Sequence, residues 1–70
     1  MNEYEKNVGR WATINSRYKT RSTGRRCLVV AFVWMGKYGD IPYYRVERID
    51  GWHPNTSLLY KVQDIVFAEA

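Results

Sequence analysis

The fold of this chain is decided by the sequence RRCLVVAFVWM at residues 25–35, in which two arginines precede nine uncharged residues. These nine residues are rich in β-branched and aromatic types, which favour β-strands. The segment is too short to cross a bilayer, and Gly24 and Gly36 stand on either side of it. We therefore predict the central strand of a small β domain. Its unbroken apolar run favours a strand that bends sharply and pairs in antiparallel fashion.

Shorter apolar segments on both sides of this strand predict an all-β fold with no true helix. Besides residues 27–35, the expected strands are residues 8–15, 41–49, 58–62 and 66–69. Residues 63–65 are too few for a helix and predict a single 3₁₀ turn before the last strand. In the first strand, Ala12 and Ile14 should share one face, and Trp11 and Thr13 the other. In the third strand, Tyr44 and Val46 should point the same way.

Seventy residues are enough for one domain, which we expect at residues 8–70 after a flexible lead-in at residues 1–7. Three Trp, six Tyr and two Phe are too many rings for so small a core, so some should lie on the surface, where they serve recognition. Trp11 either covers one end of the core or forms an exposed platform, and a core position is favoured. A core position is also expected for Trp34 and Tyr44, whereas Tyr18 and Tyr38 are the better surface candidates.

The sequence contains few residues of the types that carry catalysis or bind metals. Cys27 and His53 are each the only residue of their type, which excludes an internal disulfide and a structural zinc site made by these two alone. Cys27 is expected to be a small core residue in a reducing, cytoplasmic setting. The carboxylates are scattered, and no glycine-rich phosphate loop is present. We therefore expect neither an enzyme nor a cofactor, and no membrane partner, since residues 1–6 contain no apolar signal core.

The charges are distributed unevenly along the chain, whose formal net charge is +4. The segment from residue 6 to residue 39 contains no acidic residue and eight basic ones, namely Lys6, Arg10, Arg17, Lys19, Arg21, Arg25, Arg26 and Lys37. The remaining residues, 40–70, contain five acidic and three basic residues. A field of one sign attracts polyanions, although a small protein can also carry such charges for solubility alone.

The basic residues are densest between the first two predicted strands. If this segment is extended, Arg17, Lys19 and Arg21 lie on one side of a ribbon at intervals of about 6.5–7 Å, close to the phosphate repeat of a single strand. If the segment is a loop, the same charges cluster. The sequence Ser22-Thr23-Gly24 then supplies the tight turn into the next strand. Either arrangement predicts a basic ridge.

The sequence INSRYKTRSTGRRCLVV at residues 14–30 resembles a KOW motif, found in ribosomal proteins and transcription elongation factors. Such motifs join an apolar strand, a loop rich in Lys and Arg, and a Val-rich strand led by glycine. Gly24 matches a motif glycine, whereas Thr20 stands where another is expected. The order of five short strands with a 3₁₀ turn before the last is similar to a small SH3-like barrel. The resemblance implies binding of nucleic acid or nucleoprotein through Arg17, Lys19, Arg21 and Arg25.

We therefore expect a non-enzymatic module that binds DNA or RNA with weak sequence preference, in transcription or translation. The expected contact residues are Arg17, Tyr18, Lys19, Arg21, Arg25, Arg26, Lys37 and Tyr38. The alternative is a protein-interaction module, such as a virus-encoded regulator of a host nucleoprotein or polymerase complex, with an aromatic groove. The groove residues would be Trp34, Tyr38, Tyr43, Trp52 and Tyr60. The sequence is compatible with a monomer and with a dimer, because only Pro42 protects a strand edge from pairing with a second copy.

Overall fold

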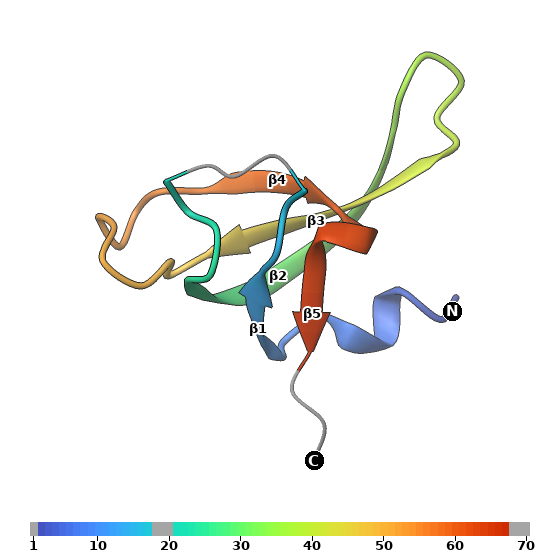
Figure 1. Ribbon diagram of the computed structural model, residues 1–70. Helices are drawn as coiled ribbons and strands as arrows, with labels where there is room; N and C mark the ends of the chain where they lie inside the picture. Colours follow the sequence, from blue (N-terminus) through green and yellow to red (C-terminus); the bar gives the residue numbers. More distant parts are fainter. Residues whose placement is uncertain (1, 18–20, 68–70) are drawn as a thin grey trace.

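The computed structural model describes residues 2–17 and 21–67 and consists of one antiparallel sheet with the strand order β4-β3-β2-β1-β5 (Figure 1). The strands are β1 (Trp11–Ile14), β2 (Arg26–Met35), β3 (Ile41–Glu47), β4 (Leu58–Lys61) and β5 (Ile65–Phe67). Two 3₁₀ segments complete the fold: η1 (Glu5–Asn7) before β1, and η2 (Val62–Asp64) between β4 and β5. The all-β prediction, its five strands and the 3₁₀ turn before the last strand are thus confirmed.

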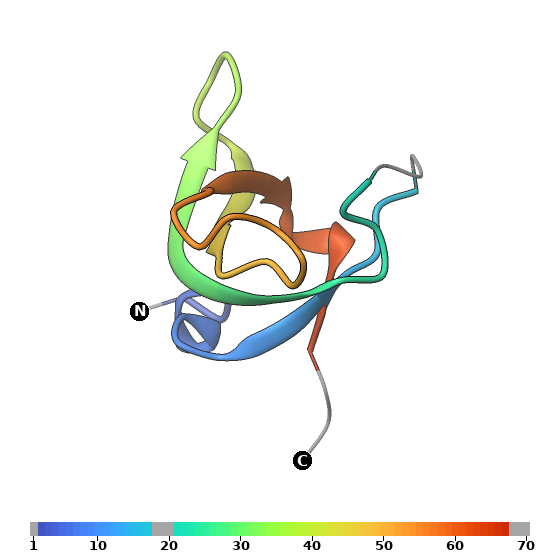
Figure 2. The same cartoon turned by 90° about the vertical axis from the view of Figure 1, so that its left-hand side faces the viewer.

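The sheet is strongly curved but is not closed into a barrel (Figure 2). Strands β4 and β5 form its two edges, and no pairing joins them within the described residues. The segment η2 leads directly from one edge strand to the other. The expectation of a closed SH3-like barrel is therefore not confirmed, whereas the antiparallel arrangement of the five strands is.

Strand β2 bends at a bulge near its middle. Its register against β3 shifts between Val29 and Ala31, so one extra residue is inserted in β2 at this point. A bulge of this kind bends the strand and increases its twist. The N-terminal part of β2 pairs with β1 as well as β3, while the part beyond the bulge pairs with β3 alone and leads into a projecting hairpin (Figure 1). The prediction of a bent antiparallel strand is thus confirmed.

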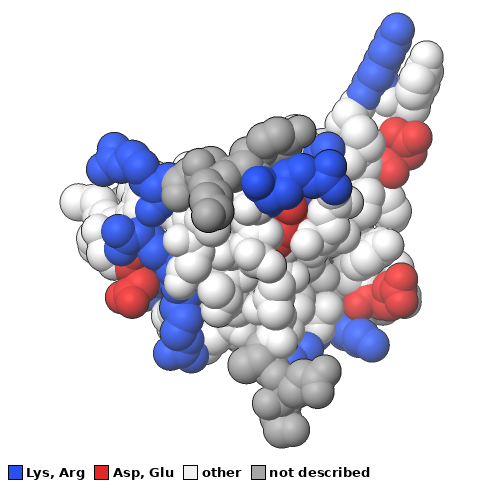
Figure 3. All heavy atoms as spheres, viewed as in Figure 1, with Lys and Arg blue, Asp and Glu red and all other residues white. Residues whose placement is uncertain are grey.

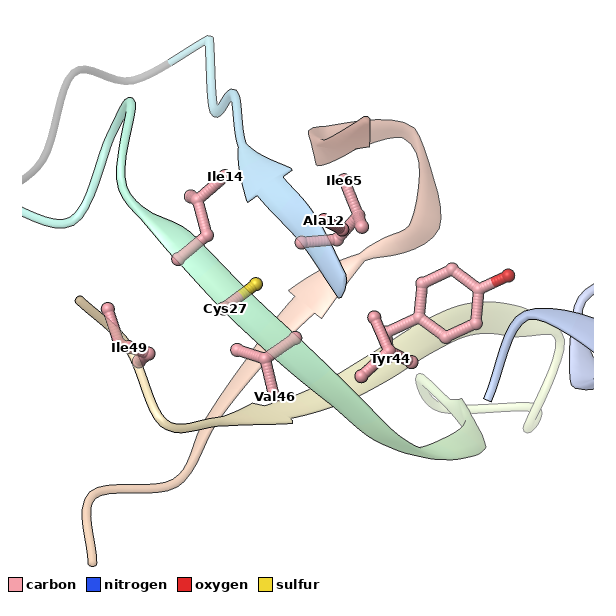
Figure 4. Close-up of a cluster of buried hydrophobic side chains, with 8 residues drawn as sticks. Ala12, Ile14, Cys27, Tyr44, Val46, Ile49 and Ile65 are labelled. Atoms are coloured by element: carbon pink, nitrogen blue, oxygen red, sulfur yellow. The ribbon is translucent and has the colours of Figure 1, made fainter. Parts of the chain in front are cut away.

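The core lies on the inner face of this curved sheet (Figure 4). Its buried hydrophobic residues are Ala12, Ile14, Cys27, Val29, Tyr44, Val46, Ile49 and Ile65. The predicted faces of β1 and β3 are confirmed, since Ala12 and Ile14 are buried together, as are Tyr44 and Val46. Cys27 is fully buried, in line with its expected place as a small core residue.

The expected core positions of two tryptophans are wrong. Trp11 is 44% exposed because it alternates with the buried Ala12 and so points to the outer face of β1. Trp34 is 48% exposed because it lies beyond the bulge, where β2 has left the body of the sheet and pairs only with the hairpin residue Pro42.

The segment that contains η1 packs against the β2–β3 hairpin through aromatic rings. The Tyr4 ring stacks on Phe32, with centroids 5.4 Å apart and an angle of 18° between the planes. The hydroxyl of the buried Tyr44 donates a hydrogen bond to the Tyr4 carbonyl at 2.9 Å and accepts one from Asn7 Nδ2 at 3.1 Å. Tyr44 therefore links the core to the chain that precedes β1.

This link predicts that Tyr44→Phe lowers the free energy of unfolding by about 1–2 kcal/mol, because the Tyr4 carbonyl and the Asn7 amide lose a partner in a partly buried site. The matched control is Tyr43→Phe, since Tyr43 is half-buried and its hydroxyl makes no hydrogen bond with the described residues. We expect this control to change stability by less than about 0.5 kcal/mol. Urea denaturation measures both, and equal effects would contradict the assigned role of Tyr44.

Candidate nucleic-acid interface

The structure separates the predicted contact residues into distinct places. Arg21 lies in the turn before β2, Arg25 follows that turn, and Arg26 is the first residue of β2; all three are exposed. Lys37 and Tyr38 lie in the loop of the projecting hairpin, at the opposite end of β2 (Figure 1). The predictions for Tyr18 and Lys19 concern residues outside the described part of the chain. Only the three arginines around the start of β2 are therefore brought together.

The turn at residues 21–24 is held by backbone hydrogen bonds, as its composition predicts. The Gly24 amide donates to the Ile14 carbonyl at 2.6 Å, and the Ile14 amide in turn donates to the Arg25 carbonyl at 3.0 Å. Gly24 has a φ of +86°, a conformation that glycine adopts without steric cost. Ser22 is buried, and its hydroxyl is hydrogen-bonded to the hydroxyl of Tyr60 on β4. The turn is thus anchored at β1 and at β4.

Arg25 connects this turn to the one that follows β3. Its Nε donates to the Arg21 carbonyl at 3.0 Å, and its Nη1 donates to the Asp50 carbonyl at 2.9 Å. The Asp50 amide donates back to the Arg26 carbonyl at 2.8 Å. Gly51, with a φ of +81°, leaves room for the guanidinium, since a Cβ at this position would collide with Nη1. Arg25 therefore keeps its positive charge on the surface while holding two turns together.

The other two arginines lie against indole rings. The Arg21 guanidinium carbon is 5.6 Å from the ring centroid of Trp52, and that of Arg26 is 5.2 Å from the ring centroid of Trp11. Both distances fall in the range of cation–π contacts. Trp52 is half-buried and packs against the core, whereas Trp11 is exposed on the outer face.

We call Arg21, Arg25, Arg26, Trp11 and Trp52 the arginine–tryptophan surface. Sequence reasoning missed its two pairs, because each joins residues that are far apart in the chain. The register of β1 against β2 is what places Trp11 near Arg26: Trp11 lies opposite Leu28, and Thr13 lies opposite Arg26. Residues two apart in a strand share a face, so the indole and the guanidinium are diagonal neighbours.

The positive charge of this surface is not neutralised by ion pairs within residues 2–17 and 21–67. None of the described carboxylates lies within 4.0 Å of the guanidinium groups of Arg21, Arg25 or Arg26. Figure 3 shows Lys and Arg side chains in a row along the left-hand side of the molecule, where the turn at residues 21–25 lies in Figure 1, with some acidic atoms among them. The potential there favours an anionic ligand.

Arg17 occupies a different environment. It lines a pocket of about 230 Å³ beside the edge strand β4. The other lining residues are Tyr43, Leu59, Tyr60, Lys61, Gln63 and Asp64. Because this pocket combines two cations with a carboxylate, its charge is more balanced than that of the arginine–tryptophan surface.

The only cysteine, Cys27, and the only histidine, His53, have different environments. Cys27 is fully buried, and burial raises the pKa of its thiol to about 11. A protonated thiol is a poor nucleophile. His53 is exposed, and its Nδ1 accepts a hydrogen bond from the Asn55 amide at 3.2 Å.

Residues 2–17 and 21–67 contain neither a metal-binding cluster nor a membrane-spanning helix. No group of three or more His, Cys, Asp or Glu residues there is arranged to hold a metal ion. No helix in this part of the chain has the length and apolar character needed to cross a membrane.

Comparison of the chain with models of protein families, with curated proteins and with solved structures gave no match. The KOW-like interpretation of residues 14–30 therefore stays a prediction that rests on the residues quoted for it.

The arrangement around Arg25 predicts different effects for two glycines with similar φ angles. Gly24→Ala should lower the free energy of unfolding by about 1–2 kcal/mol through backbone strain alone, because nothing lies within 4 Å of its new Cβ. Gly51→Ala should cost about 1 kcal/mol more, because its Cβ displaces the Arg25 guanidinium from the Asp50 carbonyl.

A double-mutant cycle checks this interpretation. In an Arg25→Ala background, the excess cost of Gly51→Ala over Gly24→Ala should disappear, because the guanidinium is no longer there to be displaced. Chemical denaturation measures the free energy of unfolding of six proteins: the wild type, Gly24→Ala and Gly51→Ala, each with and without Arg25→Ala. An excess that persists without Arg25 would show that Gly51 is needed for some other reason.

The burial of Cys27 predicts a pH-dependent contribution to stability. Because the folded-state pKa is raised from 9.0 to about 11, this contribution is complete below pH 9 and is lost as the pH rises towards 11. The free energy of unfolding of the wild type should therefore approach that of Cys27→Ala over this interval. Denaturation curves at a series of pH values measure the difference in free energy of unfolding between the two proteins. Lys and Tyr residues titrate in both proteins, so their effect cancels in this difference. A constant difference would argue against a buried, protonated thiol.

Proposed function

We propose that this protein is a small, non-enzymatic module that binds DNA or RNA through phosphate contacts made by the arginine–tryptophan surface. The observation that carries the proposal is the clustering of Arg21, Arg25 and Arg26 without carboxylate partners among the described residues. Guanidinium groups suit phosphates because their N–H donors form a planar fork that matches the phosphate oxygens. The process that the KOW resemblance of residues 14–30 implies, transcription or translation, belongs to the same proposal.

The way these arginines are held supports the proposal. A side chain already fixed by stacking or hydrogen bonding loses less conformational freedom when it binds a ligand. Arg21 and Arg26 are oriented by indole rings, and Arg25 by two backbone carbonyls. No recognition helix is present in the described part of the chain, so the proposal includes weak sequence preference. A cytoplasmic location is proposed as well, because Cys27 is a free thiol.

A second candidate function, protein binding, is favoured by the projecting hairpin. Its end carries a group of exposed apolar and aromatic side chains, namely Trp34, Met35, Tyr38 and Ile41. Tyr38 is 79% exposed, the largest value among the exposed large hydrophobic residues described. Exposed apolar groups of this kind mark interaction sites. They would serve a protein partner better than a phosphate backbone.

Salt dependence of binding tests the first proposal. We expect labelled DNA and RNA oligonucleotides to bind with an affinity that falls steeply between about 50 and about 200 mM salt. The double variant Arg21→Gln, Arg26→Gln should lower the affinity by about tenfold or more and reduce the salt slope by roughly two, the contribution of two phosphate contacts. Fluorescence anisotropy titrations measure both quantities, and circular dichroism checks that the variant is folded.

The matched control is Lys6→Gln, Lys37→Gln, which removes the same charge from η1 and from the hairpin loop. This variant should keep the wild-type affinity and salt slope if binding takes place at the arginine–tryptophan surface. Equal losses in both double variants would indicate a general charge effect without a defined site. An absence of binding together with protein capture that depends on Trp34 and Tyr38 would favour the second function.

A further inference from the structure

The two arginine–tryptophan pairs offer more than positive charge. Each pair places a flat cation over a flat aromatic ring, with guanidinium-to-centroid distances of 5.2 Å for Arg26 on Trp11 and 5.6 Å for Arg21 on Trp52. Guanidinium planes and indole rings are both surfaces on which nucleobases stack. From this geometry we infer that the ligand of the arginine–tryptophan surface is single-stranded nucleic acid, whose unpaired bases stack on these pairs. The inference rests on the proposed function and specifies its substrate.

The two pairs are held at fixed positions relative to each other. Arg25 hydrogen-bonds the carbonyl of Arg21 and the carbonyl of Asp50, two residues before Trp52, so both bonds hold the Arg21–Trp52 pair. The Asp50 amide in turn binds the carbonyl of Arg26. The Trp52 amide also donates to the Ile49 carbonyl at 3.0 Å, within the same turn. These hydrogen bonds order the Arg21–Trp52 pair and join its turn to the backbone of Arg26, while the pairing of β1 with β2 places Trp11 beside Arg26. This order exists before any ligand arrives, which reduces the entropy lost on binding.

Trp11 is placed to receive a base. It is 44% exposed on the outer face of β1, where Val66 of the neighbouring edge strand is 47% exposed. The buried core side chains described lie on the opposite face of the sheet, so the indole is not needed to fill the interior. Among the described residues, the Arg26 guanidinium makes no side-chain contact other than this stack, so the exposed indole and the arginine can present both a π-face and N–H donors to one nucleotide.

A duplex cannot use these features, because its bases are already stacked and only their edges are accessible in the grooves. Groove recognition needs an inserted helix or a two-stranded ribbon. The described helical segments are η1 and η2, of three residues each. The projecting hairpin has the form of a ribbon, but between its paired residues Met35 and Ile41 it carries one cation, Lys37, against one acid, Asp40. Duplex binding would therefore depend on charge alone.

The first test compares strand states at one length and one salt concentration. Oligo(dT) and oligo(U) of about 15 nucleotides, within the range that small single-strand-binding domains cover, should bind about tenfold or more tightly than a DNA duplex of the same length. Equal affinities for single strand and duplex, with an intact salt dependence, would overturn this inference and leave the proposed function standing. Binding to neither would overturn both.

The second test separates stacking from charge. Trp11→Leu should lower the affinity for oligo(dT) by about tenfold and leave the salt slope unchanged, because a base contact is lost and no phosphate contact is. Trp11→Phe, which keeps an aromatic face, should retain most of the affinity. Trp34→Leu is the matched control, because Trp34 is exposed to a similar extent on the hairpin, away from this surface. A larger loss from Trp34→Leu than from Trp11→Leu would overturn the assigned surface.

Because Trp52 packs against the core, its replacement by Leu can unfold the protein. Intrinsic fluorescence avoids this difficulty, since the chain has three tryptophans. The variant Trp34→Phe, Trp52→Phe keeps Trp11 as its only tryptophan, and its emission should be quenched by oligo(dT) at the same concentration at which anisotropy reports binding. Trp11→Phe, Trp34→Phe reports on Trp52 in the same way. Unchanged emission from both at saturation would overturn the inference.

Discussion

The bend in β2 is the constraint on which the rest of the structure depends. The bulge between Val29 and Ala31 lets the N-terminal part of the strand pair on both sides within the body of the sheet. The same bulge directs the C-terminal part away into the hairpin (Figure 1). The arginine–tryptophan surface and the projecting hairpin therefore lie at opposite ends of one strand, and their roles in binding can be tested independently.

The small core explains where the aromatic residues go. Among the described residues, eight buried hydrophobic side chains form the core, and Tyr44 is the one aromatic among them. The other rings described either pack at the rim, as Tyr4 does on Phe32, or reach the surface, as Trp11 and Trp34 do. A chain of 70 residues has too small an interior to bury all eleven of its aromatic rings. The surface rings are therefore available for binding.

Arg25 shows why clustered cations need not be equivalent. Its guanidinium donates hydrogen bonds to two backbone carbonyls, that of Arg21 in the turn before β2 and that of Asp50 in the turn after β3. The remaining N–H donors and the full charge stay at the surface. By holding both turns, Arg25 fixes the backbone at Arg21 and keeps a third positive charge beside Arg21 and Arg26. Its mutual repulsion with these arginines is reduced by solvent, because all three are exposed.

The sequence by itself determined the five strands, the turn at residues 22–24 and the 3₁₀ turn before β5, because alternation and turn chemistry act between near neighbours. It also determined that Cys27 and Tyr44 are core residues. Only the tertiary structure decided that Trp11 and Trp34 are exposed, that Lys37 lies far from Arg26, and that the sheet stays open. These outcomes depend on strand register and on the position of the bulge, which bring together or separate residues that are distant in the chain.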